Sequence, residues 1–180
     1  MLEEIFLDSR IRKMLQNPHK ILLEDLKLSK GDSLLDLGCG TGFLTIPASK
    51  IVDRKGVVYA VDNNSKYLDK LRRRVTELGL ENVRIINSDA ASLNGIKDCS
   101  VSKAVMMLSL HHFSYRERAL QEAYSKIAEN GVLLINEPIK QRTLGHGTDY
   151  REMLSIAESI GFKLETLVVK LFTWKALLRK

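Results

Sequence analysis

One glycine-rich stretch, Asp36-Leu37-Gly38-Cys39-Gly40-Thr41-Gly42, limits the folds open to this chain more than any other feature. It continues the apolar run Ser33–Leu37, which is typical of a short buried strand. A helical pattern follows at residues 45–52, where Pro47 is tolerated because it falls in the first turn. Glycines allow a sharp turn and the close approach of a ligand. This strand–loop–helix unit is typical of α/β proteins, which bind ligands at the carboxyl ends of their strands.

The rest of the chain alternates between β-type and helical patterns. Apolar runs typical of buried strands cover residues 57–61, 83–87, 101–108 and 132–136. Between them, a leucine-rich helical face at residues 68–78 ends at Gly79, and Ser114-Tyr115-Arg116-Glu117 has the form of a capping box that opens another helix. The alternation predicts an α/β domain with a mainly parallel sheet.

Both ends of the chain depart from this alternation. Residues 1–30 have a helical pattern, which Asn17-Pro18 divides in two, with Asn17 as a candidate N-cap. Near the other end, a helix that finishes at Gly161 is followed by the β-rich residues 162–178, which leave no room for a crossover helix. Two strands so close in sequence should form a hairpin, so the last strand is expected to enter the sheet antiparallel.

Composition sets the broad class. The 180 residues suit one domain, 1–180, and a hydrophobic fraction of 44% with 28% charged residues is ordinary for a soluble globular protein. Cys39 and Cys99 form neither a disulfide framework nor a zinc motif, so no metal site is expected. Charges interrupt every long apolar run, and the acidic start lacks a signal-peptide core. A cytoplasmic protein without a membrane span is expected.

The formal net charge of +6 raises the question of a nucleic-acid partner. Lysine and arginine are spread along the whole chain, and no stretch interleaves aromatic with basic residues as single-strand binders do. Charge therefore permits RNA binding without favouring it.

The spacing of the glycines carries more information than their number. A dinucleotide-binding fingerprint needs G-x-G-x-x-G, which would place glycine at position 43, whereas this chain has Phe43 and places a glycine at position 42. The spacing counts against an NAD(P)-dependent oxidoreductase. Backbone amides in such a loop, near a helix N-terminus, still suit an anionic group such as a carboxylate.

Two acids follow the next strands. Asp62 ends the predicted strand at residues 57–61, where its carboxylate could accept both hydroxyls of a ribose. Asp89 follows the strand at residues 83–87 and could accept from an adenine amino group, although a turn residue is a competing interpretation. Both acids are therefore expected at the same edge of the sheet as the glycine loop, where the carboxyl ends of the parallel strands meet.

With these residues, the chain resembles the class I, Rossmann-like S-adenosylmethionine-dependent methyltransferases. The matching stretches are Leu34–Gly42, Tyr59–Asp62, Asn87–Ala90 and Val132–Ile135. Among subgroups it looks most like the small-molecule "type 11" enzymes, which include the ubiquinone and menaquinone biosynthesis methyltransferases. The resemblance implies a three-layer α/β sandwich with a seven-stranded, mostly parallel sheet, an antiparallel last strand and N-terminal helices. It also implies S-adenosylmethionine as cofactor and S-adenosylhomocysteine as product.

The resemblance also implies positions around the cofactor. Gly38 and Gly40 would lie beside its methionyl part, and Asp36 would orient the loop or the amino group. Asp62 would hold the ribose, and three residues would border the adenine. These three are Asn63, Asp89 and Ala90, and the neighbouring Cys39 and Leu108 complete the expected cofactor-binding set.

The acceptor side is expected after the fourth strand. His111 and His112, in Leu108-Ser109-Leu110-His111-His112-Phe113, are the candidates for a general base because histidine titrates near neutrality. A capping or packing role is the competing interpretation. The polar, glycine-containing loop Lys140–Tyr150 and the helical residues 1–30 are candidates for covering the site.

Missing motifs narrow the acceptor. Methyltransferases that act on exocyclic base amines carry Asp/Asn-Pro-Pro-aromatic at this strand end, where this chain has Ser109-Leu110-His111-His112. Neither cysteine fits the nucleophile of a cytosine-C5 enzyme, and two cysteines are too few for arsenic methylation. A small-molecule acceptor is therefore favoured. The alternative is a cofactor-binding, non-catalytic or RNA-directed subunit; neither the acceptor nor the oligomeric state follows from the sequence.

Overall fold

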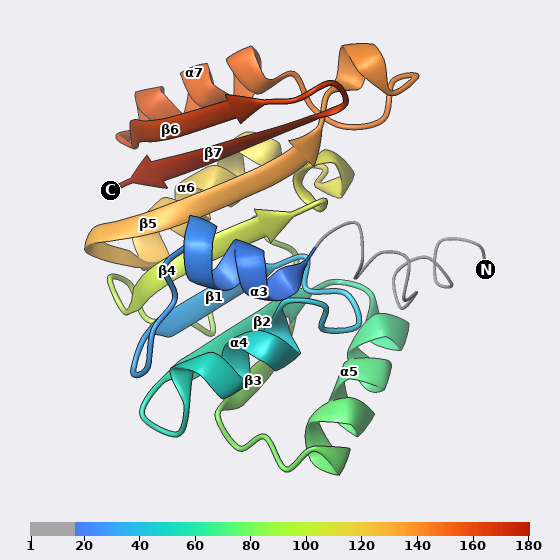
Figure 1. Cartoon of the computed structure of the whole chain (residues 1–180), viewed down its shortest axis with the longest axis vertical. Helices are drawn as coiled ribbons and strands as arrows, with labels where there is room; N and C mark the ends of the chain where they lie inside the picture. The colour runs from blue at the N-terminus through green and yellow to red at the C-terminus, as the bar shows by residue number, and fades with distance from the viewer. Residues whose placement is uncertain (1–16) are drawn as a thin grey trace.

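A computed structural model describes residues 17–180 and places one seven-stranded sheet at its centre (Figure 1). The strands are β1 (Ser33–Leu37), β2 (Val57–Asp62), β3 (Val83–Asn87), β4 (Val101–Met107), β5 (Ile127–Pro138), β6 (Lys163–Val169) and β7 (Thr173–Arg179). Their order across the sheet is β3-β2-β1-β4-β5-β7-β6. Each neighbouring pair from β3 to β5 is parallel, and β7 is antiparallel to both β5 and β6. The predicted α/β sheet with an antiparallel last strand is confirmed.

Helices cover both faces of the sheet. In Figure 1, α3 and α4 lie in front of the strands, and α6 and α7 lie behind them. The α-helices are α3 (Pro18–Lys20), α4 (Thr45–Val52), α5 (Ser65–Glu77), α6 (Arg116–Lys126) and α7 (Tyr150–Ile160), joined by the π-helical turn η1 (Ile21–Asp25) and the 3₁₀ turns η2 (Leu110–His112) and η3 (Lys140–Arg142). The expected three-layer sandwich is therefore confirmed.

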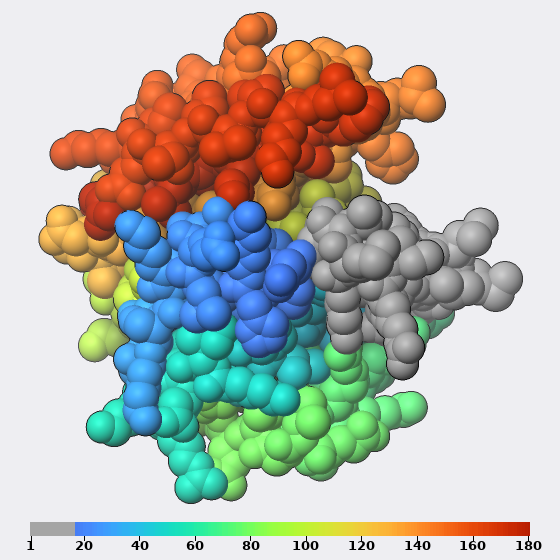
Figure 2. All heavy atoms as spheres, in the orientation of Figure 1, coloured from blue at the N-terminus to red at the C-terminus, as the bar shows by residue number. Residues whose placement is uncertain are grey.

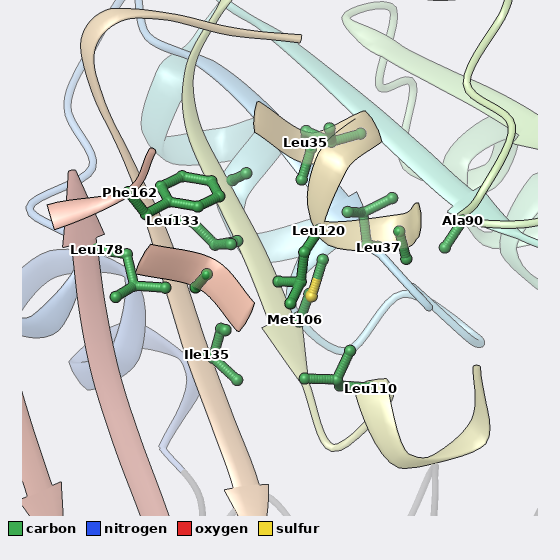
Figure 3. Packing of buried hydrophobic residues seen from close by; sticks show 14 of the residues in the cluster. Leu35, Leu37, Ala90, Met106, Leu110, Leu120, Leu133, Ile135, Phe162 and Leu178 are labelled. Atoms are coloured by element: carbon green, nitrogen blue, oxygen red, sulfur yellow. The ribbon is translucent and has the colours of Figure 1, made fainter. Parts of the chain in front are cut away.

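Alternating strand residues divide the core between the two faces. Leu35, Leu37, Met106 and Ile135 pack toward α6 and α7 in the cluster that Figure 3 displays, together with Leu120 of α6. Their neighbours in sequence pack on the other face, against η1 and α4. Figure 2 shows the blue α3–η1 segment lying over the centre of that face. Because both faces are covered, the central strands are apolar along nearly their whole length.

Within the C-terminal hairpin, β7 rather than β6 pairs with the parallel part of the sheet. The turn between β6 and β7 closes with the amide of Lys170 donating to the carbonyl oxygen of Thr173. β7 then pairs with β5 from Val132–Arg179 to Pro138–Thr173, which leaves β6 at the edge. Trp174 and the alternate residues Ala176 and Leu178 are fully buried. The apolar alternation of β7 thus selects it for the inner position.

Most of the predicted helix ends are correct. Asn17 caps α3 by accepting from the amides of His19 and Lys20, and Gly79, with φ +61°, follows the end of α5. Gly161, with φ +123°, is the C-cap of α7. The helical segment after Asn17 ends at Asp25, short of the predicted residue 30. The predicted helix before it, residues 1–16, lies outside the described residues.

The capping box predicted at Ser114 is wrong. α6 begins at Arg116, and its N-cap is Tyr115, which makes no capping hydrogen bond through its side chain. The Arg116 guanidinium instead reaches back to the carbonyl oxygens of Leu110 and His111, 3.3 and 3.0 Å away. This contact ties the start of α6 to η2, and Ser114 borders a cavity instead of capping the helix.

Two strand boundaries also differ from the prediction, each for a backbone reason. β4 stops at Met107 because Leu108 has φ +52°, a left-handed conformation that ends an extended strand. β5 starts early, at Ile127, and contains the predicted Asn-Gly turn as an irregularity: Asn130 has φ +63°. The pairing with β4 accordingly jumps from Val101–Ile127 to Lys103–Val132.

Candidate functional site

The glycine loop leaves β1 with three glycines at positive φ, and each serves a different purpose. A Cβ on Gly38 would lie 2.3 Å from the Cβ of Ser109, so close packing against the β4–η2 connection requires glycine there. A Cβ on Gly42 would lie 2.5 Å from the end of the Leu71 side chain on α5. A Cβ on Gly40 would meet nothing within 4 Å. Gly40 is therefore the glycine whose missing side chain leaves open space.

Asp62 fastens the loop to the end of β2. Its carboxylate oxygens accept from the backbone amides of Gly40, at 2.8 Å, and Asn64, at 2.9 Å. The amides of Gly38 and Cys39 both donate to the carbonyl oxygen of Val61. Each carboxylate oxygen can accept more than one hydrogen bond, so the anchor retains capacity for a ligand. Asp62 is thus a structural anchor of the loop as well as a candidate ligand-binding group.

A cavity of about 300 Å³ lies beside the loop, at the carboxyl ends of β1, β2, β3 and β4. Its wall has polar and apolar parts, as a small-molecule site requires. The lining residues are Gly38, Gly40, Val61, Asp62, Asn63, Asn64, Tyr67, Ser88, Asp89, Ala90, Leu108, Ser109, His112, Phe113 and Ser114. Strand ends of a parallel sheet thus meet here, as expected for an α/β ligand site.

Seven of the nine predicted cofactor residues border this cavity, namely Gly38, Gly40, Asp62, Asn63, Asp89, Ala90 and Leu108. Asp36 and Cys39 do not. Asp36 is buried and accepts from the Thr45 hydroxyl at 2.6 Å, which joins β1 to the first turn of α4. The two residues therefore lie behind the lining of the cavity, and for Asp36 this position agrees with the expected role of orienting the loop.

Cys39 is chemically quiet. Burial raises the pKa of its thiol well above the usual value, and the nearby carboxylates of Asp36 and Asp62 raise it further. A neutral thiol is a poor nucleophile. The cysteine of the glycine loop consequently contributes packing rather than reactivity.

The segment after β4 forms the opposite wall. The Ser109 hydroxyl donates to the carbonyl oxygen of Leu37 at 2.7 Å, which brings this segment against the glycine loop. η2 follows, and His112, an exposed residue, borders the cavity with Phe113. The ring centroids of His111 and His112 are 4.0 Å apart. The two predicted histidines thus differ in position, because His111 does not line the cavity.

His111 instead contacts Glu137, a residue that the sequence patterns did not single out. Glu137 is fully buried, and its Oε2 lies 2.6 Å from His111 Nδ1. A carboxylate inside a protein needs such partners, because burying it without them is costly. The available signal was an acid just after the apolar run Val132–Ile135, at the end of the strand that pairs with β4.

The connection after β5 approaches the same histidine. The ring of His146 lies edge-on to that of His111, with centroids 6.2 Å apart. The base of the connection is pinned where Thr148 accepts from the Trp174 indole at 3.1 Å and donates its amide to Pro138. Its tip is open, since the Leu144 side chain is fully exposed. The predicted loop Lys140–Tyr150 therefore has a fixed base and a free tip beside the histidines.

Two absences apply to the part of the chain that the structure describes. Within residues 17–180, no helix is long and apolar enough to cross a membrane. In the same residues, no group of three or more His, Cys, Asp or Glu side chains is arranged to hold a metal ion.

Known methyltransferases are similar in sequence to this chain. The ubiquinone/menaquinone biosynthesis C-methyltransferase UbiE of Blochmanniella floridana is 32% identical over 117 residues, which cover 64% of this chain but only 46% of that protein. A probable cobalt-precorrin-6B C(15)-methyltransferase (decarboxylating) of Saccharolobus solfataricus is 27% identical over 156 residues, covering 86% of this chain and 73% of that protein. The chain thus spans about half of the first relative's length and most of the second's.

A solved structure and a family model agree with these relatives. The crystal structure of a SAM dependent methyltransferase from Aquifex aeolicus superimposes with a TM-score of 0.84 and 25% identity, over 99% of this chain and 97% of that one. Residues 34–131, more than half of the chain, match the family described as a methyltransferase domain. The chain therefore belongs to the methyltransferase-domain family, as a class I S-adenosylmethionine-dependent methyltransferase.

Proposed function

We propose that this enzyme transfers the methyl group of S-adenosylmethionine to a small-molecule acceptor. The observation that carries the proposal is the cavity itself, whose wall joins the glycine loop to His112 and Phe113 on the other side. A donor held by the loop would therefore face residues suited to an acceptor. The whole domain, 1–180, with residues 1–30 covering the site, is proposed as the unit that does this.

The cavity residues fit the cofactor. Gly40 leaves open space and lies next to the spare acceptor capacity of Asp62, which suits the two hydroxyls of a ribose. We place the methionyl part beside Gly38 and Gly40, and the adenine between Asn63 and Asp89. Leu108 and Ala90 complete these walls. Asp36 and Cys39 would act through the loop rather than by contact.

A small-molecule acceptor is supported by two independent features. The relatives reported above are named as a C-methyltransferase of ubiquinone/menaquinone biosynthesis and a probable cobalt-precorrin-6B C(15)-methyltransferase. The strand end that carries Ser109-Leu110-His111-His112 lacks the Asp/Asn-Pro-Pro-aromatic motif of enzymes that act on base amines. The open-tipped loop Lys140–Tyr150 is proposed as a cover over the acceptor.

The main task of the protein in methyl transfer is to position the acceptor relative to the methyl group. When bound, the cofactor supplies a methyl carbon already activated by its sulfonium. The walls of the cavity hold the acceptor in line with it, and such positioning can contribute several kcal/mol. An acceptor that must lose a proton also needs a base, which typically contributes about 10²–10⁴-fold. We assign that role to His111, whose ring centroid lies 4.0 Å from that of the cavity-lining His112, with His112 itself as the alternative.

The proposal is tested by incubating the protein with S-adenosylmethionine and a panel of phenols, carbon acids and amines, while S-adenosylhomocysteine release is followed by mass spectrometry. We expect release above the acceptor-free rate with at least one member, and its loss in Gly40→Val. Asp69→Ala, an exposed change on α5, is the matched control.

A panel that includes a structured RNA separates the alternatives. Methylation of RNA in preference to every small molecule would overturn the acceptor assignment. Tight binding of S-adenosylhomocysteine without turnover on any acceptor would favour the non-catalytic alternative.

A further inference from the structure

We infer that Glu137 is a positioning residue that fixes His111 as the tautomer protonated at Nδ1, which leaves Nε2 free to take a proton from the acceptor. The inference deepens the proposed function and rests on it for its catalytic consequence. The tautomer itself is a property of this chain and can be measured without any acceptor.

Glu137 collects hydrogen bonds from one short stretch of backbone. Its Oε1 accepts from the amides of Ser109, at 2.6 Å, and Leu110, at 2.9 Å, and its Oε2 accepts from the amide of His111 at 3.3 Å. These donors lie at the start of η2, and β5 carries the acceptor. The carboxylate therefore fixes the backbone of the histidine before it contacts the ring.

The ring contact then decides which nitrogen carries the proton. His111 Nδ1 lies 2.6 Å from Oε2, a distance typical of a strong hydrogen bond to a charged group. An ionised carboxylate only accepts, so Nδ1 must be the donor. A neutral imidazole has one N–H, and its other nitrogen is an acceptor. Nε2, on the other side of the ring, is thereby left with its lone pair.

The other groups that face His111 do not compete for Nδ1. Arg116 of α6 uses its guanidinium on the carbonyl oxygens of Leu110 and His111. His112 and His146 contact the ring through their own rings. His111 retains 11% of its side-chain exposure, so the ring is accessible although Glu137 is not.

With S-adenosylmethionine bound, the acceptor's electron pair would form the bond to the methyl carbon, and the electron pair of the broken carbon–sulfur bond would stay on sulfur. The proton that the acceptor loses goes to His111 Nε2. The imidazolium that results is stabilised by the Glu137 carboxylate at Nδ1, and the proton later leaves to water.

The direct test is the ¹⁵N spectrum of the histidine side chains of the wild-type protein, at a pH where His111 is neutral. The signals are assigned by their loss in His111→Asn. We expect His111 to be protonated at Nδ1, the opposite of the form that free histidine prefers. A ring protonated mainly at Nε2 would overturn the inference, whatever the activity of the enzyme.

Glu137→Gln supplies the second test. The glutamine oxygen can still accept from the Ser109 and Leu110 amides, but its NH₂ group donates to Nδ1 and forces the proton onto Nε2. We expect the tautomer to switch and kcat to fall by roughly 10²–10⁴-fold, with KM little changed. Glu122→Gln is the matched control, since Glu122 also accepts from a backbone amide, that of Leu93, away from His111.

A double variant separates positioning from a merely structural role. In the His111→Ala background, Glu137→Gln should cause no further loss of kcat. A further loss of the same size would mean that Glu137 acts only by holding the backbone. If wild type shows the Nδ1 tautomer but methylates nothing, the proposed function fails while the tautomer assignment stands.

Discussion

The two walls of the cavity are built from different materials. The donor wall consists of glycines, backbone amides and the carboxylate of Asp62, which holds the loop at Gly40 and Asn64. The opposite wall, which is proposed to face the acceptor and is called the acceptor wall, includes the side chains of His112 and Phe113, with His111 beside His112 and held by Glu137. Contacts from glycines and backbone amides can bind the same ligand in many proteins. Contacts from side chains can differ between enzymes that act on different acceptors. This difference explains why the chain's sequence identifies its donor and not its acceptor.

The largest effect is expected from Asp62→Ala on the donor wall. The change removes the anchor of the loop and the proposed ribose contact together. Each charge-assisted hydrogen bond contributes about 1.5–3 kcal/mol, so affinity for S-adenosylhomocysteine should fall by roughly 10²-fold or more. Calorimetry measures it, with Asp69→Ala as control. Wild-type affinity in Asp62→Ala would refute the ribose assignment and remove the contrast between the walls.

A pair of glycine variants sharpens the roles within the donor wall. Gly38→Ala places a Cβ 2.3 Å from that of Ser109, and Gly40→Ala places one in open space. In both variants the positive φ of an alanine should lower the free energy of unfolding by about 1–2 kcal/mol. In Gly38→Ala alone, overpacking against Ser109 should lower it further, by about 1–3 kcal/mol. Urea unfolding should therefore show Gly38→Ala to be the less stable variant. Equal midpoints would contradict the assignment of Gly38 to packing.

Asp149→Ala probes a helix start that lies outside the cavity. Asp149 is the N-cap of α7 and accepts from the amides of Arg151 and Glu152, and its removal should lower the free energy of unfolding by about 1 kcal/mol. Affinity for S-adenosylhomocysteine should not change, because α7 does not border the cavity. A loss of affinity of more than a few fold would mean that the start of α7 is coupled to the cavity.

The same residue gives a pH dependence whose sign is fixed. Hydrogen bonds from the amide of Arg151 foremost, outweighing partial burial, lower the pKa of Asp149 below its ordinary value. The stability it contributes is therefore fully present above the unfolded pKa and is lost as the pH falls through the lowered folded pKa. The urea midpoints of wild type and Asp149→Ala should accordingly converge as the pH falls. A difference between the two midpoints that stays constant with pH would contradict a stabilising role for the ionised Asp149 side chain.

The smallest effect is chemical and leaves the fold unchanged. Cys99 is exposed, whereas Cys39 is buried and burial foremost raises the pKa of its thiol. Iodoacetamide at neutral pH should label Cys99 in the folded protein and leave Cys39 unmodified until urea is added. Mass spectrometry of the peptides measures this. Rapid labelling of Cys39 would show that the glycine loop opens far more often than its anchors suggest.

Prediction from sequence succeeded at positions where the residue type indicates one local backbone conformation or one helix-capping role. Glycines at 38, 40 and 42 indicated a tight loop, and all three have positive φ. Asn17 and Gly161 marked helix ends correctly for the same reason. Ser114 failed as a cap because a hydroxyl has several uses, and Arg116 satisfies carbonyl groups from the turn before α6 instead. Local signals therefore held only where no tertiary contact competed with them.

By itself, the sequence determined the α/β class, the antiparallel hairpin and the donor loop, because these follow from periodicity and from the backbone freedom of glycine over a few residues. Tertiary structure alone decided that Asp36 and Cys39 lie behind the loop, that Gly38 packs on Ser109, and that Glu137 holds His111. Those relations join residues from separate strands, which only the register of the sheet brings together. An acid and a histidine 26 positions apart in the sequence become a pair only once β4 and β5 lie side by side.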